Sequence, residues 1–113
     1  MIEDIITEIE AKVRRAEAVE DSKKKELLDL LKKLKTEVTS FSQTHGEQAN
    51  SIAGFAQIST QEATRKEPDF KLVEISVKGL RSSVAGFEKS HPHLAHVVNS
   101  ISNRLVLGIQ AIG

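Results

Sequence analysis

The chain of 113 residues contains no cysteine, tryptophan or tyrosine. Without cysteine it cannot form disulfides, thiolate metal sites, iron–sulfur clusters or a cysteine nucleophile. Sixteen basic and sixteen acidic residues cancel to a formal net charge of zero, which excludes a strongly basic protein that coats nucleic acid. The missing tyrosine and tryptophan also remove side chains that stack on bases, so we expect no nucleic-acid partner.

Long hydrophobic runs are absent as well. The most apolar stretch covers residues 105–113 and is too short to cross a bilayer, which takes about 18 apolar residues. Glu3 and Asp4 stand where a signal peptide needs basic residues. These features predict a cytoplasmic protein with no membrane span. Glycines are scattered, so no phosphate-binding loop is recognised.

Apolar spacing predicts five helices that begin near residues 2, 22, 45, 69 and 91. We therefore expect an all-α fold, an antiparallel helical bundle of four or five helices with an N-terminal helical hairpin. Residues 1–113 form a single helical domain in this interpretation, with a charged hairpin over 1–42 and a three-helix region over 43–113. No sequence repeat stands out beyond the shared periodicity.

Several local signals refine the expected helix ends. Asp21 or Ser22 suits the N-cap of the second helix, and Thr44 with Glu47 has the spacing of a capping box for the third. The first helix is expected to reach about Val19 and the fourth about Glu88. For the fifth helix, we expect an N-cap at His91 and Pro92 at the first helical position.

Two glycines fall within the predicted fourth helix. Gly79 and Gly86 are seven residues apart and therefore face the same direction. A line of missing side chains permits close approach of a neighbouring helix. The neighbour is either the third helix of the same chain or a second subunit.

The apolar stripes are narrow, near two positions in seven, which is the pattern of a coiled-coil seam. Such stripes leave little area for a core within one chain, and the second helix has leucines on more than one face. We therefore expect a homo-oligomer, with a dimer favoured, in which two hairpins make a four-helix bundle. The alternative is that the last three helices cover the seam within one chain. The candidate interface residues are Leu27, Leu31, Leu34, Val38 and Phe41, with Ile6, Ile9 and Val13 opposite.

The second half of the chain resembles a known family. The string Phe87-Glu88-Lys89-Ser90-His91-Pro92-His93-Leu94 carries the resemblance, together with Glu62-Ala63-Thr64-Arg65 and Leu80-Arg81-Ser82-Ser83-Val84. It is similar to short bacterial proteins catalogued as domain of unknown function 4404. The resemblance implies an all-helical bacterial protein and implies no activity.

The histidines offer a candidate metal site. His91, His93 and His96 lie within six positions, and His93 and His96 share a helix face. A metal site would need a further ligand, such as His45 or a carboxylate. The simpler interpretation places His91 in the turn before the last helix and His93 in its exposed first turn.

Charged residues give no catalytic constellation. Lysines at 23–25, 32, 33 and 35 interleave with acids, as on an ordinary solvated helix face, although they could also contact anionic lipid or RNA. Glu62, Glu74 and Glu88 lie in less charged regions and are candidates for buried carboxylates. No Glu-x-x-His pair is present, so the di-iron bundle pattern fails.

The sequence thus favours a non-enzymatic helical protein without a cofactor. It would act as a self-associating scaffold or a protein-interaction module. The alternative is a metal- or small-ligand-binding protein that uses the histidine turn near the start of the last helix.

Overall fold

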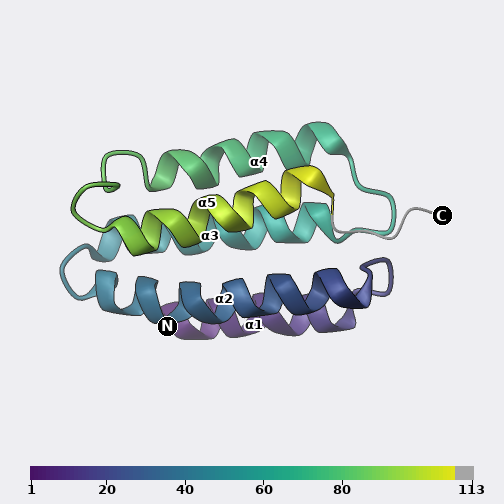
Figure 1. Cartoon of the computed structure of the whole chain (residues 1–113), viewed down its shortest axis with the longest axis horizontal. Coiled ribbons are helices and arrows are strands. Elements are labelled where there is room, and N and C mark those ends of the chain that lie inside the picture. Colours follow the sequence, from purple (N-terminus) through teal and green to yellow (C-terminus); the bar gives the residue numbers. More distant parts are fainter. Residues whose placement is uncertain (109–113) are drawn as a thin grey trace.

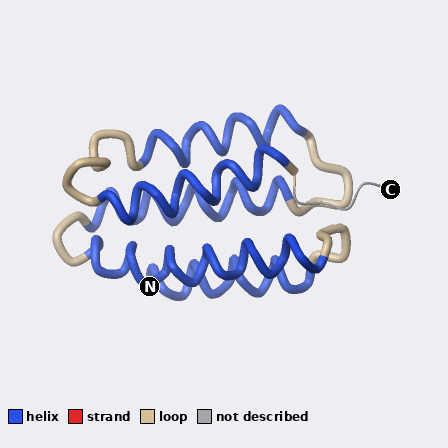
Figure 2. Tube along the Cα trace, viewed as in Figure 1, coloured by secondary structure: helices blue, strands red, loops and turns tan. Residues whose placement is uncertain are grey.

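The computed structural model describes residues 1–108, which form five helices and no strand (Figures 1 and 2). Their bounds are α1 (Ile2–Arg15), α2 (Asp21–Ser42), α3 (Gly46–Ala63), α4 (Phe70–Ser83) and α5 (Pro92–Leu107). The all-α antiparallel bundle is confirmed, and each helix begins within a residue of its predicted position. Residues 109–113, the end of the most apolar stretch, lie outside the described residues.

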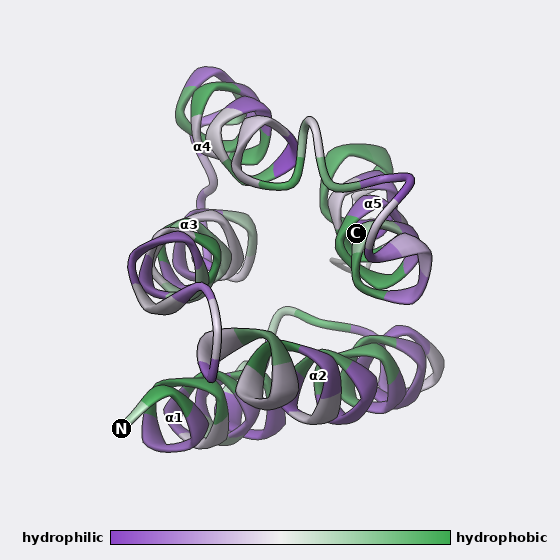
Figure 3. Ribbon diagram, turned by 90° about the vertical axis from the view of Figure 1, so that its left-hand side faces the viewer, coloured by the Kyte–Doolittle hydropathy of each residue, from purple (hydrophilic) through white to green (hydrophobic). Residues whose placement is uncertain are grey.

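The helices α2, α3, α4 and α5 surround a common interior, and α1 lies outside them against α2 and α3 (Figure 3). The described chain is elongated along the helices, with extents of 43 × 24 × 19 Å. Aliphatic side chains from all five helices fill one continuous core. Burial of this apolar surface is the main force that holds the helices together.

The predicted seam residues lie inside this single-chain core. All eight of them are buried: Ile6, Ile9, Val13, Leu27, Leu31, Leu34, Val38 and Phe41. They offer no surface to a second subunit, so their proposed role as an oligomer interface is corrected. The structure has the alternative arrangement, in which helices of the same chain cover the seam. The helices α1, α3 and α5 all pack against α2. Narrow stripes suffice because the stripes of all five helices contribute to one continuous core.

Several predicted helix ends are also corrected. The N-cap of α2 is Glu20 rather than Asp21 or Ser22. The N-cap of α3 is His45, so the capping box of Thr44 and Glu47 does not form. The first helix stops at Arg15 and the fourth at Ser83, both earlier than predicted.

The end of α4 changes the meaning of Gly86. This residue lies in the turn after the helix with φ of +93°, a left-handed conformation that glycine adopts without strain. It therefore makes a turn rather than a helix contact. His91 and Pro92, by contrast, take the predicted N-cap and first helical positions of α5.

The structure also reveals a repeat that the sequence analysis missed. The hairpins α2–α3 and α4–α5 have matching buried positions 46 residues apart, and their connecting turns lie at the same end of the bundle (Figure 1). The matching pairs are Leu27 and Val73, Leu31 and Val77, Leu34 and Leu80, Val38 and Val84, Ala49 and Ala95, and Ile52 and Val98. The bundle is thus two similar hairpins, with α1 added to the first.

Candidate docking surface

The helices α3 and α4 contact each other, and both bury small side chains. Ala56 and Ser59 of α3 are buried, as is Ser76 of α4. Each serine hydroxyl donates to a carbonyl oxygen of its own helix, Ser59 to Phe55 O at 2.7 Å and Ser76 to Leu72 O at 2.7 Å. Because these hydroxyl groups are satisfied locally, they need no partner across the contact, and the two backbones can approach closely.

Gly79 is a point of close approach between the two helices. A Cβ atom at residue 79 would overlap the ring of Phe55. The predicted close approach at Gly79 is therefore correct, and the neighbour is α3 of the same chain. The contact also shows that Phe55 of α3 and Gly79 of α4 are neighbours along the antiparallel pair.

Apolar side chains on the outer side of this contact are exposed to solvent. They are Phe55 and Ile58 on α3 and Leu72 and Ile75 on α4, and we call this group the α3–α4 face. Ile58 is 51% exposed and Ile75 is 64% exposed. The three-residue spacing on each helix puts each pair on one side of its helix. Exposed apolar groups that gather on one face mark interaction surfaces more often than single exposed residues do.

Charges of opposite sign border the two sides of the α3–α4 face. The helix α3 contains two acidic residues, Glu47 and Glu62, and no basic residue. The helix α4 contains three basic residues and one acid. Lys71 and Lys78 are four and three residues from Ile75, so they flank it on the exposed side of α4.

The sequence contained a signal for this face. Phe55, Ile58 and Ile75 are apolar residues outside the main stripe of their helices. Apolar spacing marks the stripes that form the core, and Phe55 lies near such a stripe. Ile58 and Ile75 were not predicted to lie on a common face.

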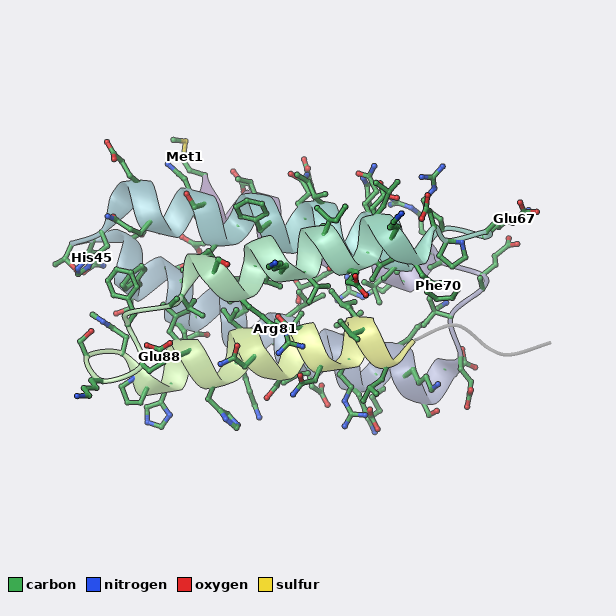
Figure 4. All side chains as sticks on the ribbon, turned by 90° about the horizontal axis from the view of Figure 1, so that it is seen from above. Met1, His45, Glu67, Phe70, Arg81 and Glu88 are labelled. Atoms are coloured by element: carbon green, nitrogen blue, oxygen red, sulfur yellow. The ribbon has the colours of Figure 1, made fainter. Side chains whose placement is uncertain are left out.

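His91 belongs to an aromatic cluster at one end of the bundle. Its ring lies 4.8 Å from Phe41 and 5.4 Å from His45, both as edge contacts, and His45 stacks on Phe41 at 4.5 Å. Figure 4 shows His45 at this end, opposite the end that holds Phe70. The role of His91 as a turn residue is confirmed.

The two turns at this end share one local design. Thr44 Oγ1 lies 2.8 Å from His45 Nδ1, and Ser90 Oγ lies 2.9 Å from His91 Nδ1. Each histidine is an N-cap with nearly the same backbone angles, φ −134° and ψ 60° at His45 and φ −136° and ψ 64° at His91. The segment Phe87–His91 is therefore one of two copies of a Phe-x-x-Ser/Thr-His turn, the other being Phe41–His45. The packing of this turn accounts for its residue types.

The three histidines of the metal hypothesis do not come together. His91 lies in the aromatic cluster, whereas His93 and His96 line a shallow hollow with Lys33 and Glu37 between α2 and α5. Within residues 1–108, no three side chains of His, Asp or Glu are placed to hold one metal ion. The proposed site at His91, His93 and His96 is thus not formed.

The buried carboxylate is a different one from those predicted. Glu10 of α1 is 3% exposed, and Lys35 of α2 donates to it at 2.6 Å. Glu74 and Glu88 are exposed, and Glu88 accepts from the backbone N–H of Gly86. Sequence spacing alone could not find Glu10, since it lies beside the apolar stripe of α1.

Glu62 is half-buried and pairs with Arg65 at 2.9 Å. This ion pair joins the last turn of α3 to the turn that follows it.

Two of the clustered lysines bind backbone carbonyl groups. Lys24 donates to Arg14 O at 3.0 Å and Lys23 to Gly108 O at 3.4 Å. Together with Lys35 on Glu10, they fasten α2 to its neighbours. The lysine clusters therefore have structural contacts in the described part of the chain.

Comparisons with protein-family models, with curated proteins and with solved structures found no match for this chain. The resemblance to domain of unknown function 4404 stays a prediction. Across residues 1–108, no helix combines the length and the apolar character that crossing a membrane requires.

Proposed function

We propose that the protein is a small, non-enzymatic interaction module that self-associates through the α3–α4 face. The observation that carries this proposal is the exposure of Phe55, Ile58, Leu72 and Ile75 on one side of the bundle. Removing such a surface from water stabilises an interface by about 25 cal/mol per Å² of apolar area. This replaces the seam of α1 and α2 as the expected contact, because that seam is already covered.

The polar residues near this face favour docking over catalysis. Lys71, Glu74 and Lys78 are exposed on α4, and Glu62 is engaged by Arg65. A protein interface commonly has such an apolar centre with a charged rim. Lysines at the rim would keep the free protein soluble and would orient an approaching partner.

The proposal is tested by two matched substitutions. Ile75→Glu introduces a charge in the centre of the α3–α4 face. Val106→Glu introduces the same charge at a 49% exposed apolar residue of α5, outside that face. Light scattering after size exclusion should show a monomer for Ile75→Glu and an unchanged assembly for Val106→Glu.

Circular dichroism should report unchanged helix content in both variants, because both side chains are exposed. If both variants associate as the unmodified protein does, the α3–α4 face is not the contact. If the unmodified protein is itself a monomer at all concentrations, the self-association part of the proposal is wrong.

A further inference from the structure

We infer that the partner of the α3–α4 face is the same face of a second copy, turned so that α3 of each protomer lies on α4 of the other. This inference rests on the proposed self-association and specifies its geometry. It is carried by the register of the two helices and by the signs of their charges.

The contact of Phe55 with Gly79 sets the levels along the antiparallel pair. Counting residues from this contact along each helix, we place Ile58 level with Ile75 on one side and Ser51 level with Ser82 on the other, to within one residue, which is about 1.5 Å. A two-fold axis parallel to the helices keeps every residue at its level and exchanges the two sides. It therefore places Ile58 of one copy against Ile75 of the other, and it does so twice.

The charges select this axis over its alternative. A two-fold axis perpendicular to the helices would place α3 on α3, with only acidic residues on both sides, and α4 on α4, with an excess of basic residues. Like charges brought together across an interface oppose binding. The parallel axis instead opposes α3, whose two charged residues are acidic, to α4, which has three basic residues and one acid, at both contacts.

The parallel axis also closes the assembly. A two-fold interface uses the same patch on both subunits, so both α3–α4 faces are covered at once. No α3–α4 face remains to recruit a third copy. The expected assembly is a dimer.

Disulfide cross-linking between single-cysteine variants tests this geometry. Ser51→Cys and Ser82→Cys are suited to it because both serines are exposed, level with each other, and on opposite sides of the face. The chain contains no cysteine of its own, so each variant carries one thiol. The two variants carry tags of different mass, are mixed at concentrations where the protein associates, and are oxidised with a glutathione buffer.

The geometry predicts that the mixed disulfide between Ser51→Cys and Ser82→Cys forms at least several-fold faster than either like-with-like disulfide. Faster cross-linking of Ser51→Cys with itself, or of Ser82→Cys with itself, would overturn this geometry. Light scattering on the reduced variants distinguishes a wrong dimer geometry from an absence of self-association. A dimer without the mixed disulfide contradicts only the arrangement, whereas a monomer contradicts the self-association on which it rests.

Discussion

The ring of Phe55 on α3 occupies the space that a side chain at residue 79 of α4 would need. This contact bears on both the interior and the surface of the bundle. It lets α3 and α4 pack closely inside the bundle, and it leaves the ring edge on the exposed α3–α4 face. Gly79 is therefore required for packing rather than for an unusual backbone conformation.

Replacing Gly79 by alanine tests the contact directly. An alanine normally stabilises a helix interior by about 1 kcal/mol relative to glycine. At Gly79 the added methyl group must displace the Phe55 ring, so we expect the free energy of unfolding to rise by much less than this, or to fall. Gly54→Ala is the matched control, since nothing lies within 4 Å of its added Cβ, and it should give most of the gain.

Urea unfolding followed by circular dichroism measures both values. In a Phe55→Ala background, Gly79→Ala should regain the helix-propensity benefit because the obstructing ring is gone. A full gain at Gly79 with Phe55 in place would show that the ring does not constrain this position.

The buried Glu10 and its partner Lys35 give a second prediction. Lys35→Met keeps the apolar stem of the side chain but leaves the Glu10 carboxylate buried without its cation. We expect a loss of roughly 1–3 kcal/mol in the free energy of unfolding. The exposed Lys32→Met on the same helix should change it by less than about 0.5 kcal/mol.

A double variant, Glu10→Leu with Lys35→Met, should recover most of the loss, because no unpaired charge remains buried. Chemical denaturation of the three variants provides the measurement. Equal stability of Lys35→Met and the double variant would mean that the unpaired Glu10 carboxylate does not lower the free energy of unfolding.

The seam residues should behave as a monomer core. Leu31 is fully buried, so Leu31→Ala should lower the free energy of unfolding by about 2–5 kcal/mol. Ile75→Ala, on the exposed face, should change the stability of the dissociated monomer by about 0.5 kcal/mol or less. Thermal and urea unfolding at low protein concentration compare the two. If Leu31→Ala causes only a small loss of stability, and this loss grows with protein concentration, the seam residues would form an interface between subunits instead.

Much of the fold could be predicted from the sequence because apolar spacing and two prolines mark helices strongly. Pro68 and Pro92 placed the starts of the last two helices to within one residue. The periodicity could not tell whether Leu31 and Val38 face the chain's own helices or another subunit, since both choices bury the same side chains. That choice depends on how five stripes converge in space.

The candidate face was harder to predict for a related reason. Ile58 and Ile75 lie on one face only because α3 and α4 pack antiparallel with Phe55 against Gly79. The repeated histidine turns were likewise hidden, because Gly46 and Pro92 differ at the first helical position of two otherwise matching hairpins. Long-range register is the information that a local pattern lacks.

The aromatic cluster predicts unequal roles for neighbouring histidines. His91→Gln removes ring contacts with Phe41 and His45 and should cost about 1 kcal/mol of stability. His93→Gln, at an exposed residue of the same turn, should cost less than about 0.5 kcal/mol. Thermal unfolding distinguishes the two, and equal effects would contradict a packing role for His91. Zinc titration by calorimetry on the same variants should show no stoichiometric heat that depends on His91.

The most direct test of the central claim is the absolute mass of the unmodified protein in solution. Light scattering after size exclusion would be recorded over a wide range of protein concentrations. We expect a mass that rises from 12.4 kDa toward twice that value and then stays constant, because a closed pair covers the α3–α4 face. A mass of 12.4 kDa at every concentration would contradict it, because the exposed residues Ile58 and Ile75 would then have no second copy to cover them.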